Sequence, residues 1–223
     1  AGVNVRVAHG LGAGNQKETE DTIHSSFLIC LVTGLIICGV GLTSSRAFLA
    51  LLHTKDELMN GAVNYLRIYS LGMPALGLYN FGNGVMSARG DTKRPLVYLF
   101  IAGVLNVIMN LIFVIGFHMA AEGVAIASVM AQYTSAGLVL HHLWKRRDVC
   151  RLQLRKVRFH KAAGQAVLML GIPGGLQQAI FAIANLFVQA GVNSFDAVTV
   201  SGNAAAANTD PLVYNSMYAF YTA

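Results

Sequence analysis

Charged residues are scarce in this chain of 223 residues: they make up 12% of it, whereas hydrophobic residues make up 55%. About a quarter of the residues in a typical soluble domain are charged. Five stretches contain no Asp, Glu, Lys or Arg, namely residues 22–45, 68–88, 95–121, 123–144 and 162–195. Each is at least as long as the roughly 20 residues that an α-helix needs to cross a bilayer core. The composition therefore excludes an ordinary soluble domain and predicts an all-α, polytopic transmembrane helical bundle.

Cysteine is also scarce, and the spacing of Cys30, Cys38 and Cys150 fits neither a disulfide framework nor a metal site. The pair His141 and His142 has no cluster of acids or further histidines that would complete a metal site. No nucleophile is paired with a base either. We therefore expect neither an enzyme nor a cofactor.

The spacing of the apolar stretches predicts where the chain crosses the membrane. We expect a short helix ending near Ala8, then spans at about 25–47, 62–88, 96–118, 121–144, 166–192 and 197–221. Basic residues concentrate in alternate gaps, with eight in 145–162 and three in 89–95. By the positive-inside rule we expect these gaps to face the cytoplasm. We expect the protein to lie in the cytoplasmic membrane. The orientation of the chain in the membrane then accounts for the net charge of +6, so this charge does not indicate a nucleic-acid partner.

The same pattern suggests how the chain is organised. Residues 145–162 alternate basic and apolar side chains, and we interpret them as a basic cytoplasmic linker that lies on the membrane surface. It would join most of a first half at 1–144 to the first two helices of a second half at 163–223. The glycine-rich residues 9–15 predict a flexible turn. Because the chain opens and closes within apparent helices, we expect a fragment of a longer protein.

Amide and hydroxyl side chains recur at helical spacing within the apolar stretches. They are Asn80, Asn83 and Ser87; Asn106 and Asn110; Ser128, Gln132 and Ser135; and Gln178, Asn185 and Gln189. One interpretation is hydrogen bonding between helices, at about 0.6 kcal/mol for each contact. The other is that four polar faces turned inward line a water-accessible substrate cavity. Pro74 and Pro173 also lie within spans, where they predict hinges.

Asp210 interrupts the otherwise charge-free residues 197–223 near their middle. An aspartate at the centre of a membrane helix costs about 2.5–3.5 kcal/mol, so it needs water, a proton, an ion or a partner. We predict that it binds the coupling ion. The alternative is a helix cap beside the break that Pro211 would cause.

Several motifs, taken in order, carry a family resemblance. They read GLGAGN at 10–15, RGDTKRP at 89–95, VLNV at 104–107, GVAIAS at 123–128, GIP at 171–173 and GNAAAAN at 202–208. This set covers nearly the whole chain and resembles the multidrug and toxic compound extrusion (MATE) family. The resemblance implies a twelve-helix antiporter of two pseudo-symmetric halves that exports organic compounds, often cationic, against inward Na⁺ or H⁺. This chain would run from the end of the second helix to the eighth. We also expect a monomer in contact with membrane lipids.

The resemblance also implies a site. Many members bind an ion with an asparagine and an aspartate one turn apart on the fifth helix and a hydroxyl residue on the sixth; the matching positions are Asn106, Asn110 and Ser128. Asn110 replaces the aspartate, and an amide can offer a carbonyl oxygen to Na⁺ but cannot take up a proton. We therefore expect Asp210 to supply the charge, and no metal other than Na⁺. Two alternatives stay open: a flippase of related fold for lipid-linked precursors, and a membrane module that transports nothing.

Overall fold

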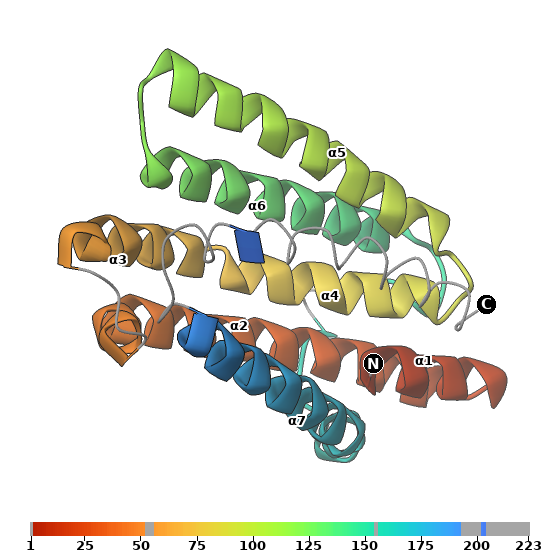
Figure 1. The fold of residues 1–223 in the computed structure, drawn as a ribbon. Helices are drawn as coiled ribbons and strands as arrows, with labels where there is room; N and C mark the ends of the chain where they lie inside the picture. Colours follow the sequence, from red (N-terminus) through yellow and green to blue (C-terminus); the bar gives the residue numbers. More distant parts are fainter. Residues whose placement is uncertain (1, 52–55, 154–155, 193–201, 204–223) are drawn as a thin grey trace. The chain divides into compact units, whose positions relative to one another are not determined.

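The computed structural model describes residues 2–51, 56–153, 156–192 and 202–203; its regular elements are helices, and these residues form no strand (Figure 1). The elements are α1 (Gly2–Gly12), α2 (Gln16–Leu51), α3 (Asp56–Ser70), α4 (Met73–Ser87), α5 (Lys93–Leu111), the π-helix η1 (Ile112–Gly116), α6 (Ala121–Lys145) and α7 (Lys161–Val192). The chain divides into two compact units, Ala1–Gly174 and Gly175–Ala223, and the boundary falls within α7. The all-α prediction is confirmed.

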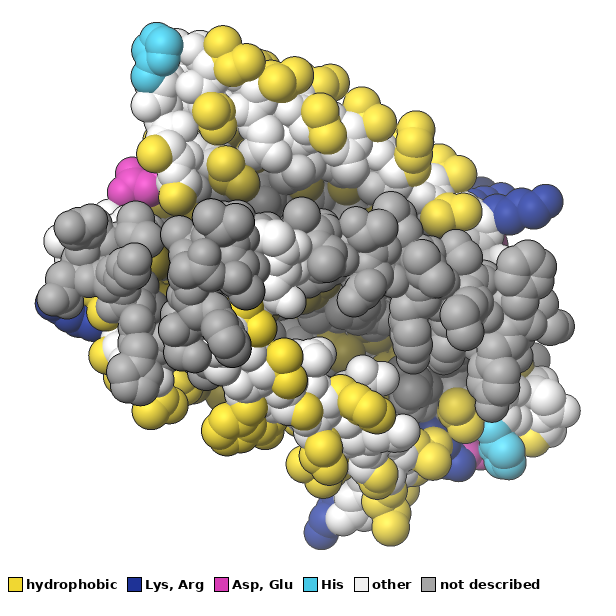
Figure 2. Space-filling model, in the orientation of Figure 1, with side chains coloured by type: hydrophobic (Ala, Val, Ile, Leu, Met, Phe, Trp, Pro, Cys, Tyr) yellow, Lys and Arg dark blue, Asp and Glu magenta, His cyan; other side chains and the backbone are white. Residues whose placement is uncertain are grey.

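Four helical segments are long and apolar enough to cross a membrane, counting only the described residues: α2, Lys93–Gly116, α6 and Lys161–Val188. Large apolar side chains on α5 are exposed, with Phe100 at 71% and Val107 at 59%. Figure 2 shows these hydrophobic side chains along α5, with Lys and Arg side chains at its end. A surface of this kind suits lipid rather than water. The chain is a multi-pass membrane protein.

The predicted single span at 62–88 is wrong in one respect, because two helices occupy it. α3 ends at Ser70 and α4 begins at Met73, with Pro74 in its first turn. Proline has no N–H to donate and its fixed φ suits the first turn of a helix, so Pro74 starts α4 instead of bending a continuous helix. Pro173, by contrast, lies inside the unbroken α7. Hinge motion at either proline stays a prediction.

In the first unit, α4 packs between α2 and α6. The core between them holds fully buried Ile23, Phe81, Val139 and Leu143. Glycine sets the spacing of α2 and α4, because a Cβ atom at Gly77 would lie only 2.7 Å from the carbonyl oxygen of Cys30. Small residues at such crossings let two membrane helices approach closely. The close packing of α2, α4 and α6 fixes the frame on which the polar groups are held.

Two local predictions differ from the structure. α1 continues to Gly12, so only Ala13, Gly14 and Asn15 form the turn, with Gly14 at a φ of 67°. Cys150 and Leu152 are buried against the bundle and do not face a membrane surface. These two side chains are buried by protein contacts, whereas Phe159 of the same segment is 53% exposed. The division of the chain at 145–162 into two halves stays a prediction.

Candidate functional site

Helix α5 packs beside α6 (Figure 1). Hydrogen bonds join Asn106, Asn110 and Ser128 where the two helices meet. Asn110 Nδ2 donates a hydrogen bond to Asn106 Oδ1 at 3.1 Å, and Asn106 Nδ2 donates to Ser128 Oγ at 3.4 Å. Ser128 Oγ in turn donates to the carbonyl oxygen of Val124 at 2.9 Å. These bonds hold three oxygen-bearing side chains in one cluster, which we call the amide cluster.

One oxygen of the amide cluster has no partner among the described residues: Asn110 Oδ1 is buried and accepts no hydrogen bond. Buried polar atoms in folded proteins are nearly always paired, so an exception needs an explanation. Carbonyl and hydroxyl oxygens are the ligands that hard cations prefer. The cluster has the donor atoms of a cation site, but it carries no formal charge of its own.

A π-helix follows the amide cluster directly. α5 ends at Leu111 and η1 runs over the next five residues, after which the chain turns at His118 with a φ of 52°. π-helical turns are rare and frequently lie at functional sites. The sequence gives no signal for this element, since the apolar residues 112–116 fit an α-helix equally well.

The predicted cavity residues are more widely distributed. Asn83 Oδ1 accepts a hydrogen bond from Ser87 Oγ at 3.2 Å within α4, whereas Asn80 is exposed. In the second unit Gln178 and Asn185 are exposed on α7. The side chain of Gln189, and Asp210 as a whole, lie outside the described residues. Among the described polar stripes, only those of α5 and α6 are joined by a hydrogen bond.

Gln132 lies one turn from Ser128 on α6 and faces the break between α3 and α4. A Cβ atom at Gly72 would collide with Gln132 Oε1, which is buried and has no hydrogen-bond partner in the described chain. Beside it, Tyr133 Oη donates to the carbonyl oxygen of Leu71 at 3.0 Å. α6 therefore contacts both the amide cluster and the break at which α4 begins.

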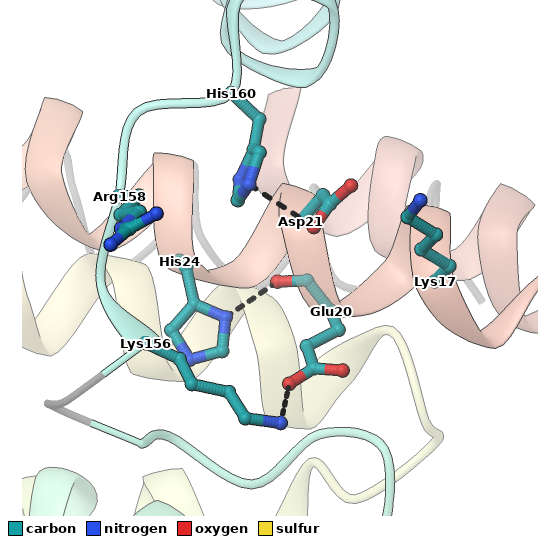
Figure 3. A pocket seen from close by; sticks show the side chains of 7 residues that line it. All are labelled: Lys17, Glu20, Asp21, His24, Lys156, Arg158 and His160. Atoms are coloured by element: carbon teal, nitrogen blue, oxygen red, sulfur yellow. Dashed lines mark hydrogen bonds and ion pairs between the residues drawn. The ribbon is translucent and has the colours of Figure 1, made fainter.

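A second polar cluster, which the sequence analysis missed, joins the start of α2 to residues 153–160 (Figure 3). Lys156 Nζ lies 2.9 Å from Glu20 Oε1, and His160 Nε2 lies 3.5 Å from Asp21 Oδ1. These side chains line an open cavity of about 380 Å³. Charge was the one sequence signal that could have predicted this cluster, because acids concentrate before the first apolar stretch and the loop after residue 145 is basic.

His24 is the buried member of this cluster, with 1% of its surface exposed. Its Nδ1 lies 2.8 Å from the carbonyl oxygen of Glu20, and the backbone N–H of Gln153 donates to its Nε2 at 3.3 Å. A carbonyl oxygen only accepts hydrogen bonds, so Nδ1 must carry the proton and Nε2 must be free of one. A neutral His24 therefore fastens the segment after α6 to α2.

Replacing His24 with leucine is expected to release this segment. The Gln153 N–H would lose its acceptor, at a cost of about 1–3 kcal/mol. Cleavage by trypsin after Lys156 or Arg158 should then accelerate about fivefold or more. The matched control is His9→Leu, since His9 is exposed and its side chain bonds to nothing in the described chain. Equal cleavage rates in the two variants would contradict the role of His24.

Comparisons with known proteins agree with the fold. The family model described as MatE matches residues 1–112. The chain is 31% identical to the probable multidrug resistance protein YpnP of Bacillus subtilis, over 89% of this chain and 46% of that protein. It is 22% identical to the probable multidrug resistance protein NorM of Thermotoga maritima, over 87% of this chain and 44% of NorM. A third relative, 21% identical over 85% and 43%, is named as the FAD transporter of Shewanella oneidensis.

Solved structures show the same arrangement of helices. A transporter of the MOP superfamily from Pyrococcus furiosus superposes with a TM-score of 0.84 over 95% of this chain and 47% of its own, at 21% identity. The inward-facing form of a multidrug resistance MATE family transporter superposes with a TM-score of 0.78 over 85% of this chain and 43% of its own, at 22% identity. The chain spans about half the length of the curated relatives it matches. Family match and fold agree, and the chain belongs to the MatE family, the multidrug and toxic compound extrusion transporters.

Proposed function

We propose that this chain is part of a cation-coupled antiporter that exports drugs and other organic compounds across the cytoplasmic membrane. The observation that carries the proposal is the amide cluster, in which Asn110 Oδ1 is buried and unpaired beside Asn106 and Ser128. Such oxygens suit Na⁺, and none of the three side chains takes up a proton in the physiological range. The cluster therefore favours Na⁺ over H⁺ as the coupling ion.

The amide cluster carries no charge, and a cation inside a membrane protein is costly without a charged group to compensate it. We further propose that Asp210, which lies outside the described residues, binds the coupling ion through its carboxylate. If Na⁺ and a substrate cation compete for one carboxylate, export requires ion entry, since a ligand shifts a conformational equilibrium only through its differential affinity for the two states. The proposed substrate contacts are Asn80, Asn83, Gln132, Gln178, Asn185 and Gln189.

The names of the relatives bear on the substrate. YpnP and NorM are named as multidrug resistance proteins, which favours export of organic compounds over the flipping of lipid-linked precursors. The relative named as an FAD transporter extends the class beyond organic cations. In this proposal the protein is a monomer and its basic loops face the cytoplasm.

The proposal is tested by ethidium efflux from cells that produce the complete protein. Raising external Na⁺ at constant pH is expected to accelerate efflux severalfold, because Na⁺ entry drives export. A matched rise in external K⁺ controls for ionic strength. Efflux that responds to neither Na⁺ nor a pH gradient would contradict coupled antiport.

A further inference from the structure

An apolar pocket of about 250 Å³ lies at the end of α6 that carries Lys145. Its walls come from α2, from α6 and from the segment that follows α6. They are Phe27, Gly137, Leu140, His141, Trp144 and Leu152. Most of these side chains are hydrophobic or aromatic, and Trp144 is 58% exposed. An aromatic side chain at the end of an apolar span typically lies at the level of the lipid headgroups.

The protein itself fixes the walls of this pocket. The backbone N–H of Leu152 donates to the carbonyl oxygen of Leu143 at 3.2 Å, which holds the segment after α6 across the end of that helix. Phe27 packs edge-to-face against the buried Phe81, with ring centroids 5.7 Å apart. At Gly137 nothing lies within 4 Å of an added Cβ atom, so the glycine leaves the pocket open.

The pocket is separate from the amide cluster. Ser128 and Gly137 are nine residues apart on α6, which places them about half a turn from each other around the helix. Ser128 bonds to α5, whereas Gly137 lies on the exposed face of α6. A molecule in the pocket would therefore contact the opposite side of the helix from the proposed cation.

Unpaired positive charges lie next in sequence to two residues of the pocket wall. Lys145 follows Trp144 directly, Arg151 precedes Leu152, and Arg147 lies between them; all three are exposed and have no acidic partner in the described chain. Asp148, the acid of this segment, is already paired with Arg89 and lies 3.5 Å from Arg146 Nε. The three unpaired basic side chains, which we call the rim, can neutralise an anion, while the wall, apolar apart from His141, suits an acyl chain.

We propose that this pocket binds an anionic phospholipid. One acyl chain lies against Phe27, Leu140 and Trp144, and the phosphate is held by Lys145 and Arg151. Cations beside membrane helices recognise anionic headgroups, and an apolar wall receives an acyl chain as readily as the surrounding lipid does. Free phosphate would engage the rim alone, and a zwitterionic lipid would gain little from the rim. The charge of the rim and the apolar wall together select an anionic lipid over both.

Trp144 is the single tryptophan of this sequence, and the difference in fluorescence between the complete protein and its Trp144→Phe variant reports on this pocket. The protein is placed in phosphatidylcholine vesicles that contain a small fraction of brominated lipid, because bromine quenches tryptophan on contact. Brominated phosphatidylglycerol should quench Trp144 at least about threefold more than brominated phosphatidylcholine at equal mole fraction. A Trp144→Phe variant supplies the background. Equal quenching by the two lipids would overturn the proposal.

Two variants separate the site from general attraction to charge. The double variant Lys145→Gln with Arg151→Gln should lose the preference, whereas Lys17→Gln with Lys93→Gln removes the same charge elsewhere and should keep it. Equal loss in both would overturn the site. Gly137→Leu, which fills the open pocket, should reduce quenching by phosphatidylglycerol about threefold. Unchanged quenching in that variant, or a preference abolished by millimolar inorganic phosphate, would show binding to the rim alone and overturn the proposal.

Discussion

Replacing Asn110 with leucine is expected to abolish Na⁺-stimulated ethidium export by the complete protein. The substitution removes the buried Asn110 Oδ1, which no protein group pairs in the described chain, and it breaks the hydrogen bond to Asn106. Removing one oxygen ligand from a bound Na⁺ weakens binding by about 1.5–3 kcal/mol, which lowers the Na⁺ affinity about 10- to 100-fold. Export at ordinary Na⁺ concentrations should fall by a similar factor.

The control is Thr134→Val, which removes a polar group from the neighbouring helix α6. The Thr134 hydroxyl donates to the carbonyl oxygen of Met130 at 2.8 Å and takes no part in the amide cluster. This variant should export normally. Normal export by Asn110→Leu would show that Asn110 does not bind the coupling ion.

Asn110→Asp is the informative partner of the leucine variant. It places a carboxylate at the position where the family resemblance implies one, and a carboxylate, unlike an amide, can take up a proton. The aspartate would be ionised at high pH and protonated at low pH. Export by this variant should therefore depend on pH more steeply than export by the unaltered protein, in which Asp210 is the proposed carboxylate.

The second large effect is expected at Asp210, which should be essential for coupling. Asp210→Asn keeps the size of the side chain but removes its charge, so Na⁺ and a cationic substrate would lose their shared partner. Ethidium export should fall to the level of cells that lack the protein. Glu122→Gln is the control, because Glu122 is an acid at the start of α6 that bonds to Asn64 away from the amide cluster. Undiminished export by Asp210→Asn would remove this residue from the mechanism.

The family resemblance implied that Asn106, Asn110 and Ser128 form one site, and spacing alone predicted only that Asn106 and Asn110 share a helix face. Asn106 and Asn110 are one turn apart, and α5 and α6 are joined by a short connection that makes them neighbours. The four candidate membrane spans could likewise be predicted, because long apolar stretches indicate helices that are surrounded by lipid.

Other features depend on contacts that no local pattern reports. His24 meets the N–H of Gln153 across 129 residues of sequence, and both the acids of α2 and the basic loop fit exposed, solvated surfaces on their own. Pro74 was predicted to bend a helix, but proline suits a first turn as well as a kink, and packing decides between them. The stretch of η1 has the composition of an α-helix, so its π-helical geometry comes from tertiary structure.

The central claim is that the amide cluster binds the coupling cation, and equilibrium binding of ²²Na⁺ to the purified complete protein tests it most directly. The unaltered protein should bind Na⁺ saturably, and Asn110→Leu should weaken this binding about 10- to 100-fold while Thr134→Val leaves it unchanged. Equal Na⁺ affinity in the unaltered protein and in Asn110→Leu would contradict the claim.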